Sequence, residues 1–159
     1  LSGMKIAYVE IDTLLAKYNF CIDLNEAMVK KSENVRLTLN QKAKELDKQK
    51  QEFQTKYQNN AYLSQERAQQ EYNRIAKLEQ DLQALSNKLQ SELMSENDKN
   101  SLQLRDSINS FLKEYNKTKG YSLIISNTGF DNLLYADSVY NITKEILEGL
   151  NARYSSPKK

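Results

Sequence analysis

The chain has 159 residues, of which 39% are hydrophobic and 28% are charged, so its mean hydropathy of -0.76 predicts a small core and mostly water-exposed helices. The 23 Lys and Arg residues against 21 Asp and Glu give a net charge of +2, which argues against a strongly basic nucleic-acid binder. The sequence contains no run of about 18 apolar residues, so it predicts no transmembrane helix.

The N-terminal part of the chain predicts a short strand followed by a short helix. Residues 5–9 alternate between two faces, as in a strand that is buried on at least one side. Asp12 or Thr13 is expected to cap the helix, which carries Leu14, Leu15 and Tyr18. Leu1-Ser2-Gly3 has the character of a tag remnant and is left out of the fold prediction.

The middle of the chain predicts a long helical hairpin. Glycine and proline are absent between Gly3 and Gly120, and apolar residues repeat there at helical spacing. The first arm is expected from about Asp23, with a narrow coiled-coil seam at Leu24, Met28, Val35, Leu39, Ala43, Leu46, Phe53 and Tyr57. The reversal is expected between Asn59 and Ser64, because Ser64 can begin a new helix.

The return arm continues the same spacing through Ala68, Tyr72, Ile75, Leu78, Leu82, Leu85 and Leu89, and again through Leu104, Ile108, Phe111, Leu112 and Tyr115. Its seam is weakest from Ser95 to Ser101, which predicts a flexible or bent zone. Gly120 after Lys117 and Lys119 is typical of a helix C-terminus. The basic stretch 36–56 is expected to face the acidic stretch 79–114 if the arms are antiparallel.

The C-terminal part predicts two further strands and a closing helix. The strands are expected at residues 121–126 and 133–135, separated by a turn at residues 127–132. Asp137 or Asn141 can cap the closing helix. So few strands leave unpaired edges, which favours oligomerisation. The residues expected in the oligomer body are Ile6, Tyr8, Val9, Leu123, Ile124, Ile125, Leu133 and Leu134.

The expected domain organisation follows from these elements. A discontinuous α+β trimerisation body would comprise residues 1–22 and 117–159, and a helical hairpin arm would comprise residues 23–116 with its tip near residues 59–64. The predicted fold class is therefore mainly α with a small β part, in which a long antiparallel hairpin projects from a small α+β body.

Residue types that support catalysis are scarce. The chain has no histidine, no glycine-rich phosphate loop and no carboxylates clustered at metal-ligand spacing, so we expect neither an enzyme nor a bound cofactor or metal. Cys21 is the single cysteine and is expected to be a small, semi-buried hydrophobic residue. The sequon Asn141-Ile142-Thr143 is explained by the helix cap.

Aromatic residues near the reversal are the more informative feature. They either complete the seam of the arms or offer apolar contact to another protein, because amphipathic rings tolerate both water and a partner. Nearby cations would add salt-sensitive attraction. The candidate binding residues are Phe53, Tyr57, Tyr62, Tyr72, Lys48, Lys50, Lys56 and Arg67.

Several of these features together resemble the Skp/OmpH family of periplasmic chaperones over essentially the whole chain. The resemblance rests on the opening Lys5-Ile6-Ala7-Tyr8-Val9, the charged hairpin, Tyr121-Ser122-Leu123-Ile124-Ile125, Tyr135-Ala136-Asp137 and Asn141-Ile142-Thr143-Lys144-Glu145-Ile146-Leu147. The family's closing helix usually begins Asp-Ile-Thr, and Asn141 serves equally well as a cap.

The resemblance implies a homotrimer in which the β pieces build a shared body and three hairpins surround a cavity. It implies an ATP-independent holdase that binds unfolded outer-membrane proteins in the periplasm of a Gram-negative bacterium, after removal of a signal peptide. The net charge of +2 departs from the strongly basic members of the family, and predicts weaker electrostatic capture, no specific nucleic-acid binding and only weak contact with membrane surfaces.

One alternative function is a structural coiled-coil adaptor whose hairpin binds a specific folded partner. The adaptor would require a folded partner and ignore unfolded chains, whereas a holdase binds unfolded chains. A histone-like DNA binder is disfavoured by the mixed charge, and duplex binding that persists at physiological salt would revive it.

Overall fold

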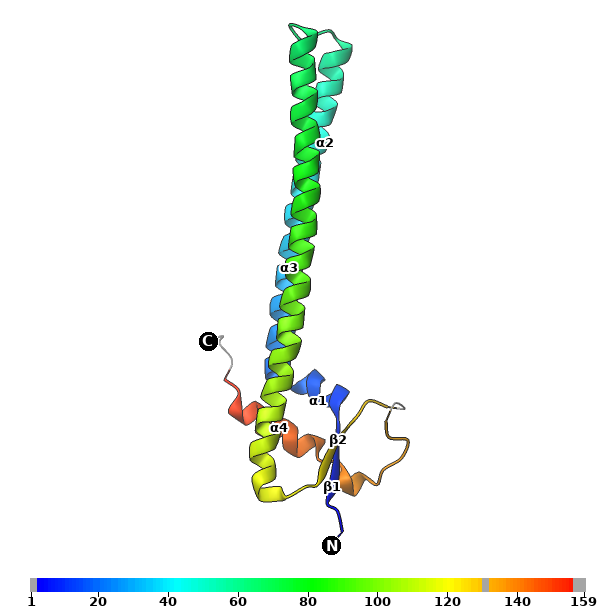
Figure 1. Cartoon of the computed structure of the whole chain (residues 1–159), viewed down its shortest axis with the longest axis vertical. Coiled ribbons are helices and arrows are strands. Elements are labelled where there is room, and N and C mark those ends of the chain that lie inside the picture. The colour runs from blue at the N-terminus through cyan, green and yellow to red at the C-terminus, as the bar shows by residue number, and fades with distance from the viewer. Residues whose placement is uncertain (1–2, 130–131, 156–159) are drawn as a thin grey trace. The chain divides into compact units, whose positions relative to one another are not determined.

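The computed structural model describes residues 3–129 and 132–155. Leu1 and Ser2 of the expected tag remnant, and Phe130 and Asp131 of the expected turn, lie outside these residues. The elements in chain order are β1 (Ile6–Glu10), α1 (Ile11–Lys17), α2 (Asn19–Gln58), α3 (Gln65–Lys119), β2 (Leu123–Asn127), the 3-10 helix η1 (Ser138–Tyr140) and α4 (Thr143–Arg153) (Figure 1). The predicted class, mainly α with a small β part, is confirmed.

The chain divides into two compact units. The body unit comprises residues 1–27 and 98–159, and the arm unit comprises residues 28–97. The body unit therefore reaches further into both long helices than expected, to residue 27 rather than 22 in α2 and back to residue 98 rather than 117 in α3. The reason is that Leu104, Ile108 and Phe111 of α3 pack against the core of the body unit, so this part of the helix belongs with the short elements.

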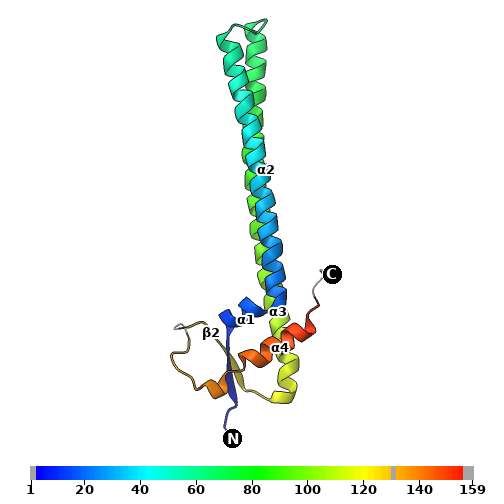
Figure 2. The same ribbon diagram turned by 180° about the vertical axis from the view of Figure 1, so that it is seen from behind.

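The sheet of the body unit has two parallel strands that come from distant parts of the sequence. β1 pairs with β2 in a register that runs from Ile6 opposite Leu123 to Glu10 opposite Asn127 (Figures 1 and 2). The expectation that the two terminal β pieces meet is therefore confirmed. β1 lies one residue later than the sequence pattern predicts, and β2 begins two residues later and ends one residue later than predicted.

The core of the body unit is small and is completed by α1, α2 and α4. Its largest fully buried side chains are Tyr18, Leu14, Ile146 and Leu150. The Tyr18 hydroxyl lies 2.8 Å from Ser107 Oγ, so its polar end has a hydrogen-bond partner on α3. Cys21 is buried in the same core, as the sequence predicts, and burial raises the pKa of its thiol.

The expected cap of α1 is wrong. The helix begins at Ile11, directly after β1, and its start has no side-chain cap, so Asp12 lies within the first turn. The Glu10 N–H instead donates to Thr143 Oγ1 of α4 at 2.8 Å. A side chain more than 130 positions away thus satisfies the backbone at this junction, which local sequence cannot reveal.

The long helix also begins earlier than expected, at Asn19 and not near Asp23. Asn151 of α4 bridges the break between α1 and α2. Its Oδ1 accepts from the Asn19 N–H at 2.8 Å, and its Nδ2 donates to the Lys17 carbonyl at 3.1 Å. A contact from α4 therefore holds both helix ends, which lets α2 start immediately after Tyr18.

The end of α3 agrees with the predicted helix stop. Gly120 has a φ of +68°, the left-handed conformation expected of a glycine cap. The Asn116 side chain also accepts from the Tyr121 N–H at 2.7 Å and donates to the Tyr121 carbonyl at 2.9 Å. Upstream, α3 is a continuous helix through residues 95–101, and flexibility of that zone stays a prediction.

The expected third strand is wrong. Residues 133–135 form no strand, and Leu134 and Tyr135 are 81% and 84% exposed. The position beside β1 is taken by an isolated bridge between Tyr8 and Asn141, and this segment does not pair with β2 either.

The two caps that were expected after this segment serve separate elements. Asp137 Oδ1 accepts from the Val139 N–H at 3.1 Å and caps η1. Asn141 Oδ1 accepts from the Thr143 N–H at 3.0 Å just before α4, but the N-cap residue of that helix is Ile142, which makes no side-chain cap.

Candidate functional site

The arm unit is an antiparallel pair formed by α2 and α3, which lie side by side in both ribbon views (Figures 1 and 2). Residues 59–64 join the two helices, where the sequence predicts the reversal, and Asn60 there has a φ of +53°. Ser64 Oγ accepts from the Arg67 N–H at 3.1 Å, which is the predicted cap of the return helix.

Ion pairs join the two arms, and that of Lys50 with Glu79 connects the predicted basic and acidic stretches. Lys31 Nζ lies 3.0 Å from Glu96 Oε1, and Lys50 Nζ lies 3.0 Å from Glu79 Oε1. All four groups are partly exposed, so each pair contributes about 0–1 kcal/mol and serves register more than stability.

The aromatic residues singled out in the sequence form one group, the tip cluster of Phe53, Tyr57, Tyr62 and Tyr72. Phe53 is its centre: its ring centroid lies 5.9 Å from that of Tyr57, 5.7 Å from that of Tyr62 and 6.1 Å from that of Tyr72. Spacings of this size are typical of favourable aromatic pairs. The tip cluster therefore completes the end of the seam, which is the structural half of the sequence interpretation.

The tip cluster also presents ring surface to solvent. Two grooves, of about 510 and 220 Å³, share Phe53, Tyr57 and Tyr72 in their linings. Tyr57 is 49% exposed and Tyr72 is 57% exposed. The larger groove reaches the buried Ile75 and the smaller reaches the buried Ala68. Apolar surface is thus open on the cluster, and contact of this surface with another protein stays a prediction.

Not all of the predicted cations are free to attract a binding partner. Lys50 lines the larger groove but is paired with Glu79, whereas Lys48, Lys56 and Arg67 are exposed. On α3, Arg74 pairs with Glu71 at 2.6 Å and also donates to Gln49 Oε1 of α2 at 2.7 Å. The charge around the tip cluster is therefore mixed.

The neighbouring side chains shift the pKa values of two groups at the tip cluster, Glu71 and Tyr62. The hydrogen bond from Arg74 lowers the pKa of the Glu71 carboxyl. Desolvation, with a smaller effect of Glu71, raises the pKa of the Tyr62 hydroxyl. Glu71 thus stays ionised and Tyr62 stays neutral at neutral pH.

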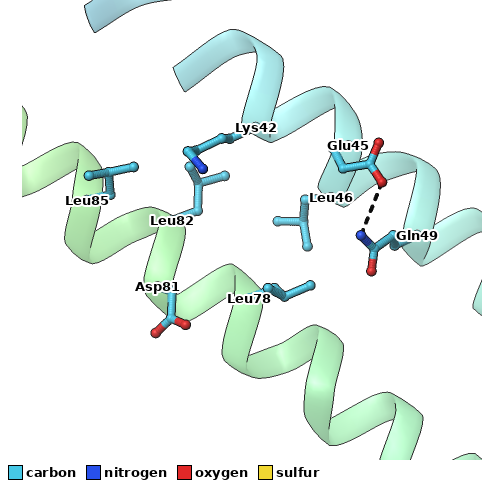
Figure 3. A pocket seen from close by; sticks show the side chains of 8 residues that line it. All are labelled: Lys42, Glu45, Leu46, Gln49, Leu78, Asp81, Leu82 and Leu85. Atoms are coloured by element: carbon cyan, nitrogen blue, oxygen red, sulfur yellow. Dashed lines mark hydrogen bonds between the residues drawn. The ribbon is translucent and has the colours of Figure 1, made fainter. Parts of the chain in front are cut away.

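Farther along the arm unit, the seam contains an incompletely filled space, which we call the leucine gap. In Figure 3, Leu46 of α2 faces Leu78, Leu82 and Leu85 of α3 across this space. Its volume is about 200 Å³, and Lys42, Glu45, Gln49 and Asp81 complete its lining. Sequence analysis found these leucines but not the gap. The available signal was that Lys42 and Gln49 each follow a seam leucine by three residues, where a coiled coil normally has a second apolar residue.

Filling the leucine gap should stabilise the arm unit. For Lys42→Leu we expect a gain in the free energy of unfolding of about 0.5–2 kcal/mol, because the new side chain packs against leucines that are open on one side. Lys44→Leu is a matched control, since Lys44 is exposed and does not line the gap. Urea denaturation followed by circular dichroism measures both, and equal effects of the two substitutions would contradict the packing explanation.

The residues expected in the oligomer body occupy three environments. Tyr8 and Val9 are buried within the chain. Ile6, Ile124, Ile125 and Leu133 are half-buried, and Ile124 packs against the core. Leu123 is 48% exposed, and Leu134 is more exposed still. The single chain therefore already uses part of this set for its own core.

Two other features are absent from the described residues. No helix among them is long and apolar enough to cross a membrane. No group of three or more His, Cys, Asp or Glu side chains in the described ranges could hold a metal ion.

Comparison with known proteins gives a consistent assignment. The fold matches the crystal structure of a Caulobacter crescentus protein described as an OmpH-like outer membrane chaperone, with a TM-score of 0.84, 12% identity, and coverage of 100% of this chain and 90% of that chain. No curated protein sequence matches. The family model described as outer membrane protein (OmpH-like) matches residues 5–150. A match over this much of the chain places the protein in the OmpH-like outer membrane protein family.

Proposed function

We propose that the protein is an ATP-independent holdase chaperone for unfolded outer-membrane proteins. It acts in the periplasm of a Gram-negative bacterium, as a homotrimer whose arms enclose a cavity for the client. Membership of the OmpH-like family and the fold shared with a protein described as an outer membrane chaperone support a chaperone role. The arms supply the client surface, and the body supplies the contacts between copies.

The observation that carries the proposal is the exposed part of the tip cluster. A holdase must bind apolar segments of many sequences and release them without fuel, which requires several weak contacts rather than one deep pocket. Tyr57 and Tyr72 offer ring surface between two shallow grooves, while Phe53 fixes them from the seam side. Tyrosine rings at such positions remain compatible with water after the client leaves.

The test is an aggregation assay with a urea-denatured outer-membrane β-barrel protein diluted into buffer. We expect near-stoichiometric amounts of the chaperone, counted as trimer, to suppress light scattering without added nucleotide. Light scattering after size exclusion should give the mass of three chains. A chain that leaves aggregation unchanged is no holdase, and a protein that binds one folded partner but ignores unfolded chains is the coiled-coil adaptor.

A double substitution locates the client surface. Tyr57→Ser with Tyr72→Ser should weaken client binding about two- to tenfold for each ring removed, because an aromatic contact contributes roughly 0.5–1.5 kcal/mol. Leu37→Ser is the control, since Leu37 is 52% exposed in the same unit but lies outside the tip cluster. Affinity is measured by fluorescence titration of a labelled client. Equal losses in the control and the double variant would place binding elsewhere on the arms.

A further inference from the structure

The two grooves of the tip cluster lie one after the other on the same side of the arm unit. Ala68 of α3 lines the smaller groove and Ile75 lines the larger. These positions are seven residues apart, so they share nearly the same face of the helix and lie about 10.5 Å apart along it. Tyr57 and Tyr72 line both grooves. The grooves therefore form one elongated surface, long enough for about four residues of an extended chain at about 3.3 Å per residue.

The linings of these grooves carry little net charge. Lys50 and Glu79 are the charged residues of the larger groove, and they pair with one another at 3.0 Å. The side chains that line the smaller groove are all uncharged. An occupant that is recognised through its own charge, such as a phosphate group or an acidic peptide, requires unpaired cations, and neither lining supplies one among the described residues. The grooves therefore suit a neutral, apolar occupant.

Four glutamines, which we call the rim glutamines, also line the two grooves. Gln54 and Gln58 of α2 belong to the larger groove, and Gln65 and Gln69 of α3 belong to the smaller. All four are exposed. Gln69 Nε2 donates to Asn73 Oδ1 at 3.0 Å, whereas the other three side chains make no hydrogen bond within the part of the chain that the structure describes. A side-chain amide both donates and accepts, as a peptide group does.

We propose that the rim glutamines bind the backbone of an extended client segment whose apolar side chains lie in the two grooves. The inference rests on the proposed function and assigns the conformation in which the arm holds its client. The N–H and C=O groups of an unfolded chain need hydrogen-bond partners when they leave water. Amide side chains supply these partners whatever the client's sequence. The rings of the tip cluster thus contact the client's side chains, and the rim glutamines contact the backbone that all clients share.

The spacing of the rim glutamines matches an extended chain. Gln54 and Gln58 are four residues apart, so they lie on one side of α2 and about 6 Å apart along it. In an extended chain the backbone groups of residues i and i+2 point to the same side and lie about 6.6 Å apart. Both glutamines can therefore reach one edge of the same segment.

A helical occupant would not use the rim glutamines in this way, because a helix pairs its own backbone groups internally. An extended segment also matches the proposed clients, since the strands of outer-membrane β-barrels alternate apolar and polar residues and carry aromatic residues near their ends. The apolar side chains on one face of such a segment enter the grooves, while the polar side chains on its other face stay in water. The occupant is thus an extended, alternating segment of a β-barrel client.

Isosteric substitution tests the backbone contact. Gln54→Met with Gln58→Met keeps the length and helix propensity of both side chains but removes their amides. The double variant should bind a labelled, urea-denatured outer-membrane β-barrel protein about two- to tenfold more weakly for each hydrogen bond lost, as measured by fluorescence titration. Gln51→Met with Gln70→Met is the matched control, because both residues are exposed and line neither groove. The control should bind as the wild type does, with equal helix content by circular dichroism.

A backbone ester separates the amide contact from side-chain packing. The probe is a synthetic peptide of about eight residues that alternates threonine and valine around a central tyrosine, with a lysine at each end, and it competes with the labelled client. Replacing a central amide by an ester removes an N–H donor and leaves every side chain in place. The ester should weaken competition for the wild type and cost less in the double methionine variant, where the partner is already absent.

The outcomes separate this inference from the proposed function. Client binding that is unchanged or tighter in the double methionine variant, or an ester cost equal in both proteins, overturns the backbone contact and leaves the holdase proposal intact. A peptide that does not displace the client from the wild type overturns the extended-segment docking. A wild-type chain that binds with this dependence on glutamine but leaves aggregation unchanged overturns the holdase proposal and supports the backbone contact.

Discussion

Replacing Ile146 by alanine should destabilise the body unit by about 2–5 kcal/mol, the range for removal of a large aliphatic side chain from a core. Ile146 is fully buried on α4, and it lies in one cluster with Leu14 of α1, Tyr18 between α1 and α2, and Leu150 of α4. The core is small, so the surrounding side chains have little freedom to collapse into the space that the substitution leaves.

The free energy of unfolding should be measured by urea denaturation at fixed chain concentration, because association adds to apparent stability. Seven of the ten tyrosines lie in the body unit, so tyrosine fluorescence is weighted toward that unit, while circular dichroism is dominated by the long helices. Leu147→Ala is the matched control on the next residue of α4, since Leu147 is only partly buried. A loss below roughly 0.5 kcal/mol for Ile146→Ala, the size of an ordinary surface effect, would show that this cluster is not the core.

Gly149→Ala should destabilise the protein by about 1–3 kcal/mol, the usual cost of overpacking a core. Alanine is normally favoured over glycine inside a helix by about 1 kcal/mol, so helix propensity alone predicts the opposite sign. A Cβ at Gly149 would overlap Cζ of Phe111 and lie 2.7 Å from its Cε1. The ring of Phe111 stacks on Tyr115 at 5.9 Å and has little room to withdraw.

A double-mutant cycle separates the clash from other effects. In a Phe111→Leu background the ring is absent, and Gly149→Ala should become neutral or stabilising. Gly3→Ala is the control for glycine removal without a neighbour, because nothing lies within 4 Å of its added Cβ. Destabilisation of the same size in both backgrounds would refute the contact with Phe111 as its cause.

The proposed holdase and the packing of the arms are connected through stability. An arm with a fully packed seam would be more stable but would expose less apolar surface. The leucine gap and the half-exposed tyrosines show a seam that is left incomplete at two places. We infer that the arms keep apolar surface accessible at some cost in stability, as binding surfaces commonly do.

The sequence predicted the features that depend on local pattern. The heptad spacing of Leu39, Leu46 and Phe53 predicted the hairpin, because a narrow apolar stripe on a polar helix needs a second helix to cover it. Ser64 and Gly120 predicted a helix start and a helix end, because capping involves only neighbouring backbone groups. The aromatic residues of the tip cluster were recognised for the same reason, since they lie within a few turns of the reversal.

Only the tertiary structure decided the features that depend on distant contacts. Thr143 and Asn151 on α4 satisfy backbone groups at the two ends of α1, which moved both helix starts from their expected positions. Residues 133–135 have strand character but pair with neither β1 nor β2, because strand formation depends on tertiary pairing and not on propensity alone. The clash at Gly149 and the leucine gap likewise arise where side chains far apart in sequence meet, and no local pattern encodes such meetings.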